Sequence, residues 1–352
     1  MVGLRLERRE VPTYAFVLVP VSAFAASFLV GGLLMAWAGV DPLVGYSAFV
    51  KGAFGSLPTF ADTLVRMVPF LLMGTGIALS DRANVLNIGA EGQLIVGALA
   101  TTWICVAMQD WAPAPLIALL ALALSSLAGG AWAGFAGYLK AKMGINEVVT
   151  TVMMNWLAFK LMQWLLRGPL KSPKSEMWPM SPPLEPEMPI ILPGTRLHAG
   201  FALAVLLAVA GYYFLFRTNV GFKLRACGKN PAAARYAGYD VEKMVILSMV
   251  VSGAFAGLAG AVEVMGVYHF LFEGISVGLG YTAIIVALVG KDHPIAVIPS
   301  AFMFGVIYNG VVFLQGATGL TYTLSKAIEG MIYLFVLVSE VLLTYRIRVV
   351  RS

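Results

Sequence analysis

Several acidic, amide and hydroxyl side chains stand within long apolar runs of this 352-residue chain. Ionisable and strongly polar groups are costly to bury in such surroundings, so they usually contact one another, water or a passing solute. Glu147, Thr151 and Asn155 recur four residues apart, which places them on one face of a helix; a position of Glu147 at the edge of the apolar layer is the alternative. We predict a polar path lined by Asn87, Glu91, Gln93, Glu147, Thr151, Asn155, Glu263 and Asn309.

The composition identifies the surroundings of these groups. Hydrophobic residues make up 59% of the chain and charged residues 12%, where a soluble domain carries roughly 25% charged residues. The 37 glycines agree, because glycine is more frequent in membrane helices than in soluble ones. The composition excludes an ordinary soluble enzyme and predicts an all-α polytopic membrane protein.

Apolar runs that reach the roughly 20 helical residues needed to cross a bilayer recur about ten times. We predict spans at 14–40, 58–80, 87–109, 113–139, 147–166, 199–217, 244–266, 270–290, 294–315 and 321–344. One transmembrane domain, 14–345, then lies between an N-terminal tail, 1–13, and a C-terminal tail, 346–352.

The basic residues orient these spans. With the N-terminus inside, most of the 24 Lys and Arg residues fall in cytoplasmic loops, as the positive-inside rule requires. Both termini are then cytoplasmic, residues 219–243 form a cytoplasmic loop, and 167–198 form an external loop. This topology and contact with anionic lipid account for the net charge of +6, so we predict no nucleic-acid partner.

Catalytic and metal-binding patterns are missing from the sequence. The two cysteines and three histidines are widely separated, which excludes a disulfide framework and predicts no metal site. No cluster of Asp, His or Cys suits an enzyme at the membrane surface. The phosphate-binding pattern G-x-x-x-x-G-K-[ST] is also absent. We predict that the chain is not an enzyme and that another polypeptide hydrolyses any ATP that drives it.

Two spans are short and interrupted by glycine. Their continuous apolar parts cover only 93–108 and 278–289, and the first must recruit 87–92 to cross. Laying 87–99 over 276–288 pairs Gly89 with Gly278 and three further identical residues, although four matches also arise by chance. Short, glycine-interrupted spans at corresponding places in two halves indicate an inverted repeat around a transport path.

The cytoplasmic loop 219–243 contains a short helix with both ends specified. Asn230 is a good N-cap, Pro231 suits the first helical position, and Gly238 provides a left-handed stop. Two helical turns alone are marginal in water. The helix therefore either packs on neighbouring membrane helices or docks onto a separate cytoplasmic protein through Asn230, Pro231, Ala232, Ala233, Ala234, Arg235, Tyr236, Ala237 and Gly238.

The external loop 167–198 holds eight of the 18 prolines. Irregular, proline-rich backbone cannot face lipid, so this segment is exposed. A docking surface for an extracytoplasmic partner and a stiff connection are both compatible with it.

Four motifs in order along the chain carry a family resemblance. They are Leu-Asn-Ile-Gly-Ala-Glu-Gly-Gln at 86–93, Gly-Ile-Asn-Glu-Val-Val at 144–149, the segment 224–238 and the small-residue run 252–261. Together they resemble the permease subunits of bacterial ABC importers, in the family of ribose and branched-chain amino-acid permeases, and within it the nucleoside and simple-sugar branch. The resemblance covers about 60–345; residues before 58 carry no motif of the family.

This resemblance implies a vitamin-B12-permease-like fold, the type II ABC importer architecture, and transport by alternating access. It implies a second permease subunit, the same or related, cytoplasmic ABC ATPases that bind ATP and magnesium, and an extracytoplasmic substrate-binding protein. No cofactor is then expected in this chain, and the location is the bacterial inner membrane. By resemblance, residues 230–238 would be the helix that couples the permease to the ATPase.

An ion-coupled secondary transporter of a small polar solute is the alternative from another class. It would couple transport through Glu91, Glu263 and Glu329. Uptake driven by an ion gradient with this chain alone distinguishes it from an importer that requires an added ATPase.

Overall fold

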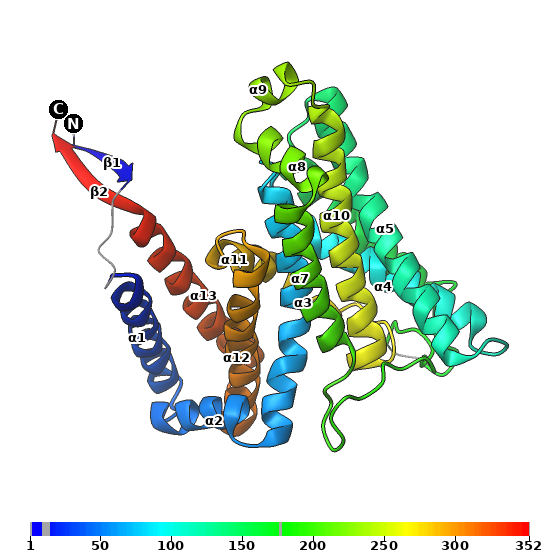
Figure 1. Ribbon diagram of the computed structural model, residues 1–352. Coiled ribbons are helices and arrows are strands. Elements are labelled where there is room, and N and C mark those ends of the chain that lie inside the picture. The colour runs from blue at the N-terminus through cyan, green and yellow to red at the C-terminus, as the bar shows by residue number, and fades with distance from the viewer. Residues whose placement is uncertain (1, 9–14, 176–177, 352) are drawn as a thin grey trace. The chain divides into compact units, whose positions relative to one another are not determined.

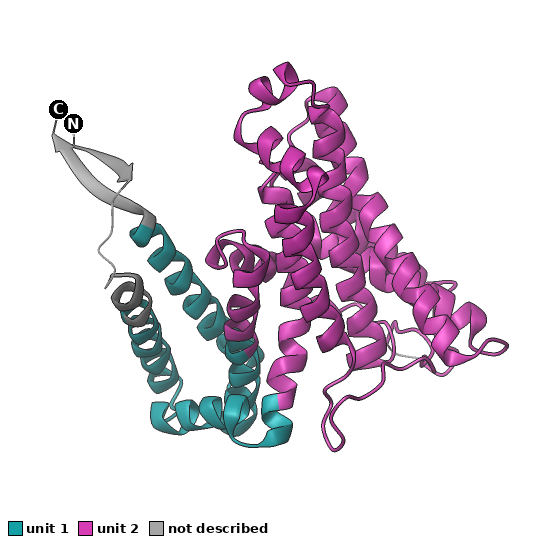
Figure 2. Ribbon diagram, viewed as in Figure 1, with its two compact units in different colours: residues 1–60, 306–352 teal, residues 61–305 magenta. Residues whose placement is uncertain are grey.

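The computed structural model describes residues 2–8, 15–175 and 178–351, with side chains over 22–343 apart from 176–177. The described chain is mostly helical (Figure 1). It forms two compact units, one of residues 61–305 and one of 1–60 with 306–352 (Figure 2). The limits given above for the transmembrane domain, 14–345, remain a prediction.

The unit of residues 61–305 contains most of α3 and the elements that follow it as far as the first half of α12. In chain order these are α3 (Leu57–Asp81), α4 (Ala90–Met108), α5 (Ala114–Met143), α6 (Glu147–Arg167), α7 (Gly200–Arg217), α8 (Asn219–Lys229), α9 (Pro231–Tyr236), α10 (Val241–Val262), a π-helix (Glu263–Tyr268), α11 (Leu279–Val289) and α12 (Pro294–Thr318).

Helix α10 packs against both α4 and α5 (Figure 1). Glycine makes the close approach possible, because a Cβ on Gly257 would overlap the backbone of α5 and one on Gly97 would overlap the backbone of α10. Small residues at such contacts let membrane helices approach closely. Helices α4, α5 and α10 thus pack closely together, and this packing fixes the position of α4.

The proline-rich segment after α6 lies along the chain that follows α10. Backbone N–H groups of Ser181, Leu184 and Met188 donate to carbonyls of residues 271, 269 and 265 at 2.8–3.1 Å. These bonds satisfy polar backbone that has no helix of its own. Residues 176–177 of this predicted loop lie outside the described residues.

The other unit contains both ends of the chain. It holds β1 (Val2–Arg8), α1 (Ala15–Trp37), α2 (Pro42–Phe54), the second half of α12, α13 (Tyr322–Thr344) and β2 (Tyr345–Arg351). Helices α1 and α13 pack together, and β1 pairs antiparallel with β2. The Tyr46 hydroxyl donates to the Phe28 carbonyl and ties α2 to α1.

Six of the described helices are long and apolar enough to cross a membrane. They are α3, α4, α5, α7, α10 with its π-helix, and α12, and each lies on a predicted span. The predicted spans 147–166 and 321–344 form α6 and α13. The other two predicted spans contain α1 and the shorter apolar helix α11.

Four elements were not predicted, namely α2, α8, β1 and β2. Helix α2 begins at an Asp41 cap, whose carboxylate accepts from the Leu43 N–H at 2.8 Å. Helix α8 occupies part of the predicted loop 219–243, with Thr218 as its cap. The predicted tails include strands β1 and β2, where the sequence alternates apolar and charged residues as strands do. Residues 1, 9–14 and 352 of those tails lie outside the described residues.

Candidate functional site

The Glu91 carboxylate lies where the N-termini of α4 and α11 meet. Gly89 precedes α4, and Gly278, with φ of 82°, precedes α11. The backbone N–H of Gly278 donates to Glu91 Oε1 at 2.9 Å, and that of Gly280 donates to Oε2 at 2.6 Å. N-terminal N–H groups have no partner within their own helix and carry partial positive charge, so a carboxylate there satisfies and stabilises them.

Glycine at position 280 permits this meeting. A Cβ on Gly280 would overlap the backbone of Ala90 and Glu91. Any larger residue would separate the two helix starts and remove the Glu91 carboxylate from its donors. Gly278 serves differently, because its left-handed backbone conformation is one that residues with a side chain rarely adopt.

An amide pair braces the turn before α4. Asn87 Nδ2 donates to Gln93 Oε1, and Gln93 Nε2 donates back to Asn87 Oδ1, both at 2.9 Å. Asn87 also donates to Ser252 Oγ of α10 at 2.8 Å and accepts from the Gly89 N–H at 2.9 Å. Both amides are fully buried. Since nearly all their polar atoms are paired, they fix the turn rather than offer free groups to a solute.

Asn155 ties α6 to the same turn. Its Oδ1 accepts from the Gly92 N–H at 2.8 Å, and its Nδ2 donates to the Ile88 carbonyl at 2.9 Å. The same Nδ2 lies 3.3 Å from the Tyr281 hydroxyl oxygen of α11. Asn155 therefore connects three segments that are far apart in the sequence.

A pocket of about 330 Å³ opens beside these groups. Its polar lining includes Glu91, Asn155, Glu273 and the Tyr281 side chain, and Ile95, Trp156, Phe159 and Val277 contribute apolar surface. A largely apolar hollow with a few converging polar groups is typical of a small-molecule site. We call it the inner pocket.

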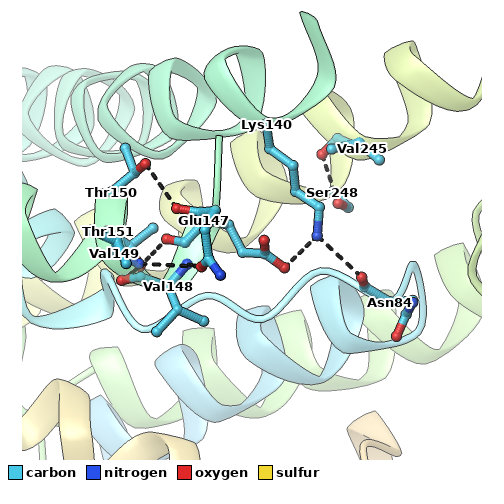
Figure 3. Close-up of polar contacts among 10 residues, drawn as sticks. Asn84, Lys140, Glu147, Val148, Val149, Thr150, Thr151, Val245 and Ser248 are labelled. Atoms are coloured by element: carbon cyan, nitrogen blue, oxygen red, sulfur yellow. Dashed lines mark hydrogen bonds and ion pairs between the residues drawn. The ribbon is translucent and has the colours of Figure 1, made fainter. Parts of the chain in front are cut away.

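Two residues of the predicted polar face do not reach the inner pocket with their polar groups. Glu147 forms an ion pair with Lys140 of α5, whose Nζ also lies 3.5 Å from the Asn84 carbonyl (Figure 3). The Thr151 hydroxyl donates to the Glu147 carbonyl of its own helix at 2.7 Å. Thr151 instead packs against the turn at Gly89.

Glu263 and Asn309 interact with groups other than Glu91. Glu263 is buried at the start of the π-helix, where it interacts electrostatically with the positive charges of Arg66 and Arg196. Asn309 belongs to the other unit and donates to the carbonyls of Gly52 and Thr59 at 2.9 and 3.1 Å. The structure thus brings together four of the eight predicted path residues, namely Asn87, Glu91, Gln93 and Asn155.

The short helix predicted at 230–238 is present as α9. Asn230 Oδ1 accepts from the Ala233 N–H at 3.0 Å, and Gly238 has φ of 81°. Ala234 is buried, whereas Tyr236 is 97% exposed. The helix therefore presents a bulky aromatic side chain that no described residue covers.

Some lining residues of the inner pocket were not predicted. In the sequence, nothing distinguishes Trp156, Phe159 and Glu273 from ordinary residues of an apolar span or loop. Only the glycines at 274, 278 and 280 marked this part of the sequence as unusual. Within the described ranges, no three His, Cys, Asp or Glu side chains gather as metal ligands would.

Known proteins resemble the chain over most of its length. The family model described as branched-chain amino acid transport system / permease component matches residues 59–338. The glucose ABC transporter permease protein TsgB13 of Haloferax volcanii is 33% identical, over 98% of this chain and 94% of its own.

Two further relatives are similar in extent. The guanosine ABC transporter permease protein NupP of Bacillus subtilis is 33% identical, over 91% of this chain and 92% of its own. The nucleoside ABC transporter permease protein NupB of Lactococcus lactis is 28% identical, over 93% and 92%. No solved structure matches. The chain therefore belongs to the family of branched-chain amino acid transport system permease components, which are membrane transport proteins and not enzymes.

Proposed function

We propose that this chain is the permease subunit of an ATP-driven importer that carries nucleosides or simple sugars. The glucose, guanosine and nucleoside permeases to which it is similar support this substrate class. The observation that carries the proposal is the position of the Glu91 carboxylate on the N–H groups of Gly278 and Gly280.

The Glu91 carboxylate argues for a neutral solute. In transporters with interrupted helices, free helix N-termini attract the anionic group of a substrate. Here a carboxylate of the chain occupies the N-terminus of α11 and adds negative charge to the inner pocket. An amino-acid substrate would bring a second carboxylate close to the first, whereas a nucleoside or sugar presents only neutral hydroxyl and amide-like groups.

The proposed fold is the vitamin-B12-permease-like architecture with an inverted repeat. Helices α4 and α11 start at a shared point, as two related half-spans at the centre of such a repeat would. Ten crossings follow if α1, α6, α11 and α13 join the six long apolar helices. Their polar faces would then pack on protein, because polar side chains facing lipid are costly.

Energy would come from ATPase subunits on the cytoplasmic side, the side on which we also place both termini. Helix α9 suits the coupling role, because its ends are capped and the Tyr236 side chain is exposed. We place the chain in the bacterial inner membrane, where a second permease subunit would complete the path. An extracytoplasmic binding protein would deliver the solute at the external segment 167–198. Alternating access follows if ATP binding moves α9 and the spans attached to it.

Reconstitution tests the proposal. Vesicles containing this chain, its ATPases and its binding protein should accumulate guanosine or glucose only when ATP is supplied to the cytoplasmic side. Uptake by the chain alone in an ion gradient would overturn the proposal and establish a secondary transporter.

Variants of α9 test the coupling step. Ala233→Glu and Tyr236→Ala change exposed residues of α9, so we expect a normal melting temperature together with lost uptake. Tyr213→Ala is the matched control, since Tyr213 is 63% exposed on α7. Normal ATP-driven uptake by both α9 variants would show that the ATPase docks elsewhere.

A further inference from the structure

A second pocket of about 540 Å³ lies next to the inner pocket. Its walls come from the end of α6, the segment at Trp178–Met180 and residues 270–274. A backbone bridge between Met180 and Phe272 holds two of these walls together. We call it the outer pocket.

Aromatic rings dominate the outer pocket. Phe270 and Phe272 have ring centroids 5.6 Å apart at 47°, and Tyr268 meets Phe272 edge-on at 5.0 Å. Trp178 lines the same space and is 70% exposed. An indole that is this exposed contributes little to a hydrophobic core, so much of its surface can contact a solute.

The charged groups of the outer pocket are paired with each other. The guanidinium of Arg167 lies 2.6 Å from Glu273 Oε1, and Gln163 Nε2 donates to Glu273 Oε2 at 3.0 Å. The remaining lining includes Pro179, Met180 and the aromatic rings. A sugar would find few free hydrogen-bonding side chains there, whereas a planar base gains from stacking on Trp or Phe.

The two pockets share a wall. Glu273 and Gly274 line both, so a solute held against the aromatic rings lies directly across the ion-paired Glu273 from the inner pocket. Pockets of about 300–1,000 Å³ hold small organic ligands, and the outer pocket falls within that range.

We propose that the outer pocket is a nucleobase-binding site, in which Trp178 and Phe270 stack on the planar base of a nucleoside before it enters the inner pocket. This inference rests on the proposed function and narrows its substrate class to nucleosides.

Uptake kinetics of the complete importer test the site. Trp178→Ala and Phe270→Ala should each lower kcat/KM for guanosine about tenfold, the size expected for one lost stacking contact. Trp178→Phe keeps an aromatic face and should stay within about threefold of the wild type. Trp164→Ala is the matched control, because Trp164 is 66% exposed on α6 and lines neither pocket.

The outcomes separate the two proposals. If the wild-type importer fails to take up guanosine with ATP, the proposed nucleoside function fails. If the wild type transports guanosine and both alanine variants match it, the outer pocket is not a base-binding site. An equal loss in Trp164→Ala, or an equal loss of glucose uptake in an importer that carries both solutes, would also overturn stacking as the cause. Loss confined to guanosine and to the two pocket variants supports the site.

Discussion

Glu91 Oε2 lies 2.6 Å from the backbone nitrogen of Gly280, which joins the start of α4 to the start of α11. Two helix N-termini therefore share one carboxylate: α4 carries it in its own first turn, and backbone N–H groups at the start of α11 donate hydrogen bonds to it. A hydrogen bond to a charged group contributes more than one between neutral groups. Loss of this charge should affect both the fold and the inner pocket that it lines.

Replacing Glu91 with glutamine keeps the side-chain volume but removes the charge. The amide can accept one N–H and turns its own NH₂ toward the other, so we expect a loss of about 2 kcal/mol in the free energy of unfolding. ATP-driven uptake should fall at least tenfold. Glu147→Gln is the control, because its ion pair with Lys140 is partly exposed and lies apart from the pocket, and it should cost at most about 1 kcal/mol. Equal melting temperatures and uptake for the two variants would contradict this role of Glu91.

A methyl group at position 280 should break the same junction. Gly280→Ala would push its Cβ into the backbone of Glu91, and overpacking against backbone costs roughly 3 kcal/mol or more. Gly330→Ala is the matched control within helix α13, where no described residue outside the adjoining turns of the helix comes within 4 Å of the new Cβ. That variant should gain about 0.5–1 kcal/mol from helix propensity. Melting temperatures in detergent measure both, and a stable Gly280→Ala protein would show that the two helix starts are not in contact.

The sequence predicts where the helices lie along the chain better than it predicts the contacts between them. Six long apolar helices lie where they were predicted, because a helix that can cross a membrane is recognisable from its length and apolar composition alone. The start of α9 was also predictable, since the Asn230 cap and Pro231 act locally. Helix α8 was missed because Gly221 and Gly228 disfavour a helix in isolation, yet both lie against other backbone in the fold.

The candidate site was predictable only in part. Asn87, Glu91, Gln93 and Asn155 were visible as polar residues in apolar runs. The backbone groups that bond Glu91 and Asn155 belong to segments far away in the sequence, and Asn87 and Gln93 bond each other, so the sequence alone did not show these pairings. Glu147 shared the helical periodicity of Asn155 and yet pairs with Lys140, because the neighbouring helix α5 supplies a charge that periodicity cannot reveal. The aromatic walls of the two pockets resemble ordinary membrane-span residues until the fold places them together.

Asn155 should stabilise the fold through hydrogen bonds of both its Oδ1 and its Nδ2. Asn155→Ala leaves the Gly92 N–H and the Ile88 carbonyl without their partner, and two buried groups left unpaired cost about 2–4 kcal/mol. Lys160→Ala on the same helix is the control, because Lys160 is exposed and surface changes usually stay within about 0.5 kcal/mol. Thermal unfolding of the two variants provides the comparison. A similar, small change in both would mean that Asn155 does not hold α6 to the turn.

His198 couples the stability of the chain to pH. Its side chain is 1% exposed, the Gly200 N–H donates to Nδ1 at 3.2 Å, and a Cβ on Gly266 would strike the ring. Burial, with smaller effects from His269 and Arg196, lowers the pKa of His198 from 6.5 to about 4. The folded protein therefore holds this imidazole neutral in a pH range where the unfolded chain protonates it.

The sign of the effect follows from proton uptake. As the pH falls from 6.5 toward 4, the unfolded chain binds a proton at His198 that the folded chain does not, so the free energy of unfolding decreases. By about pH 5 the loss reaches roughly 2 kcal/mol. His198→Asn retains an acceptor for the Gly200 N–H and does not titrate, so its melting temperature should fall less than that of the wild type between about pH 7.5 and pH 5. Parallel curves for the two proteins would show that His198 takes up its proton equally well in the folded state.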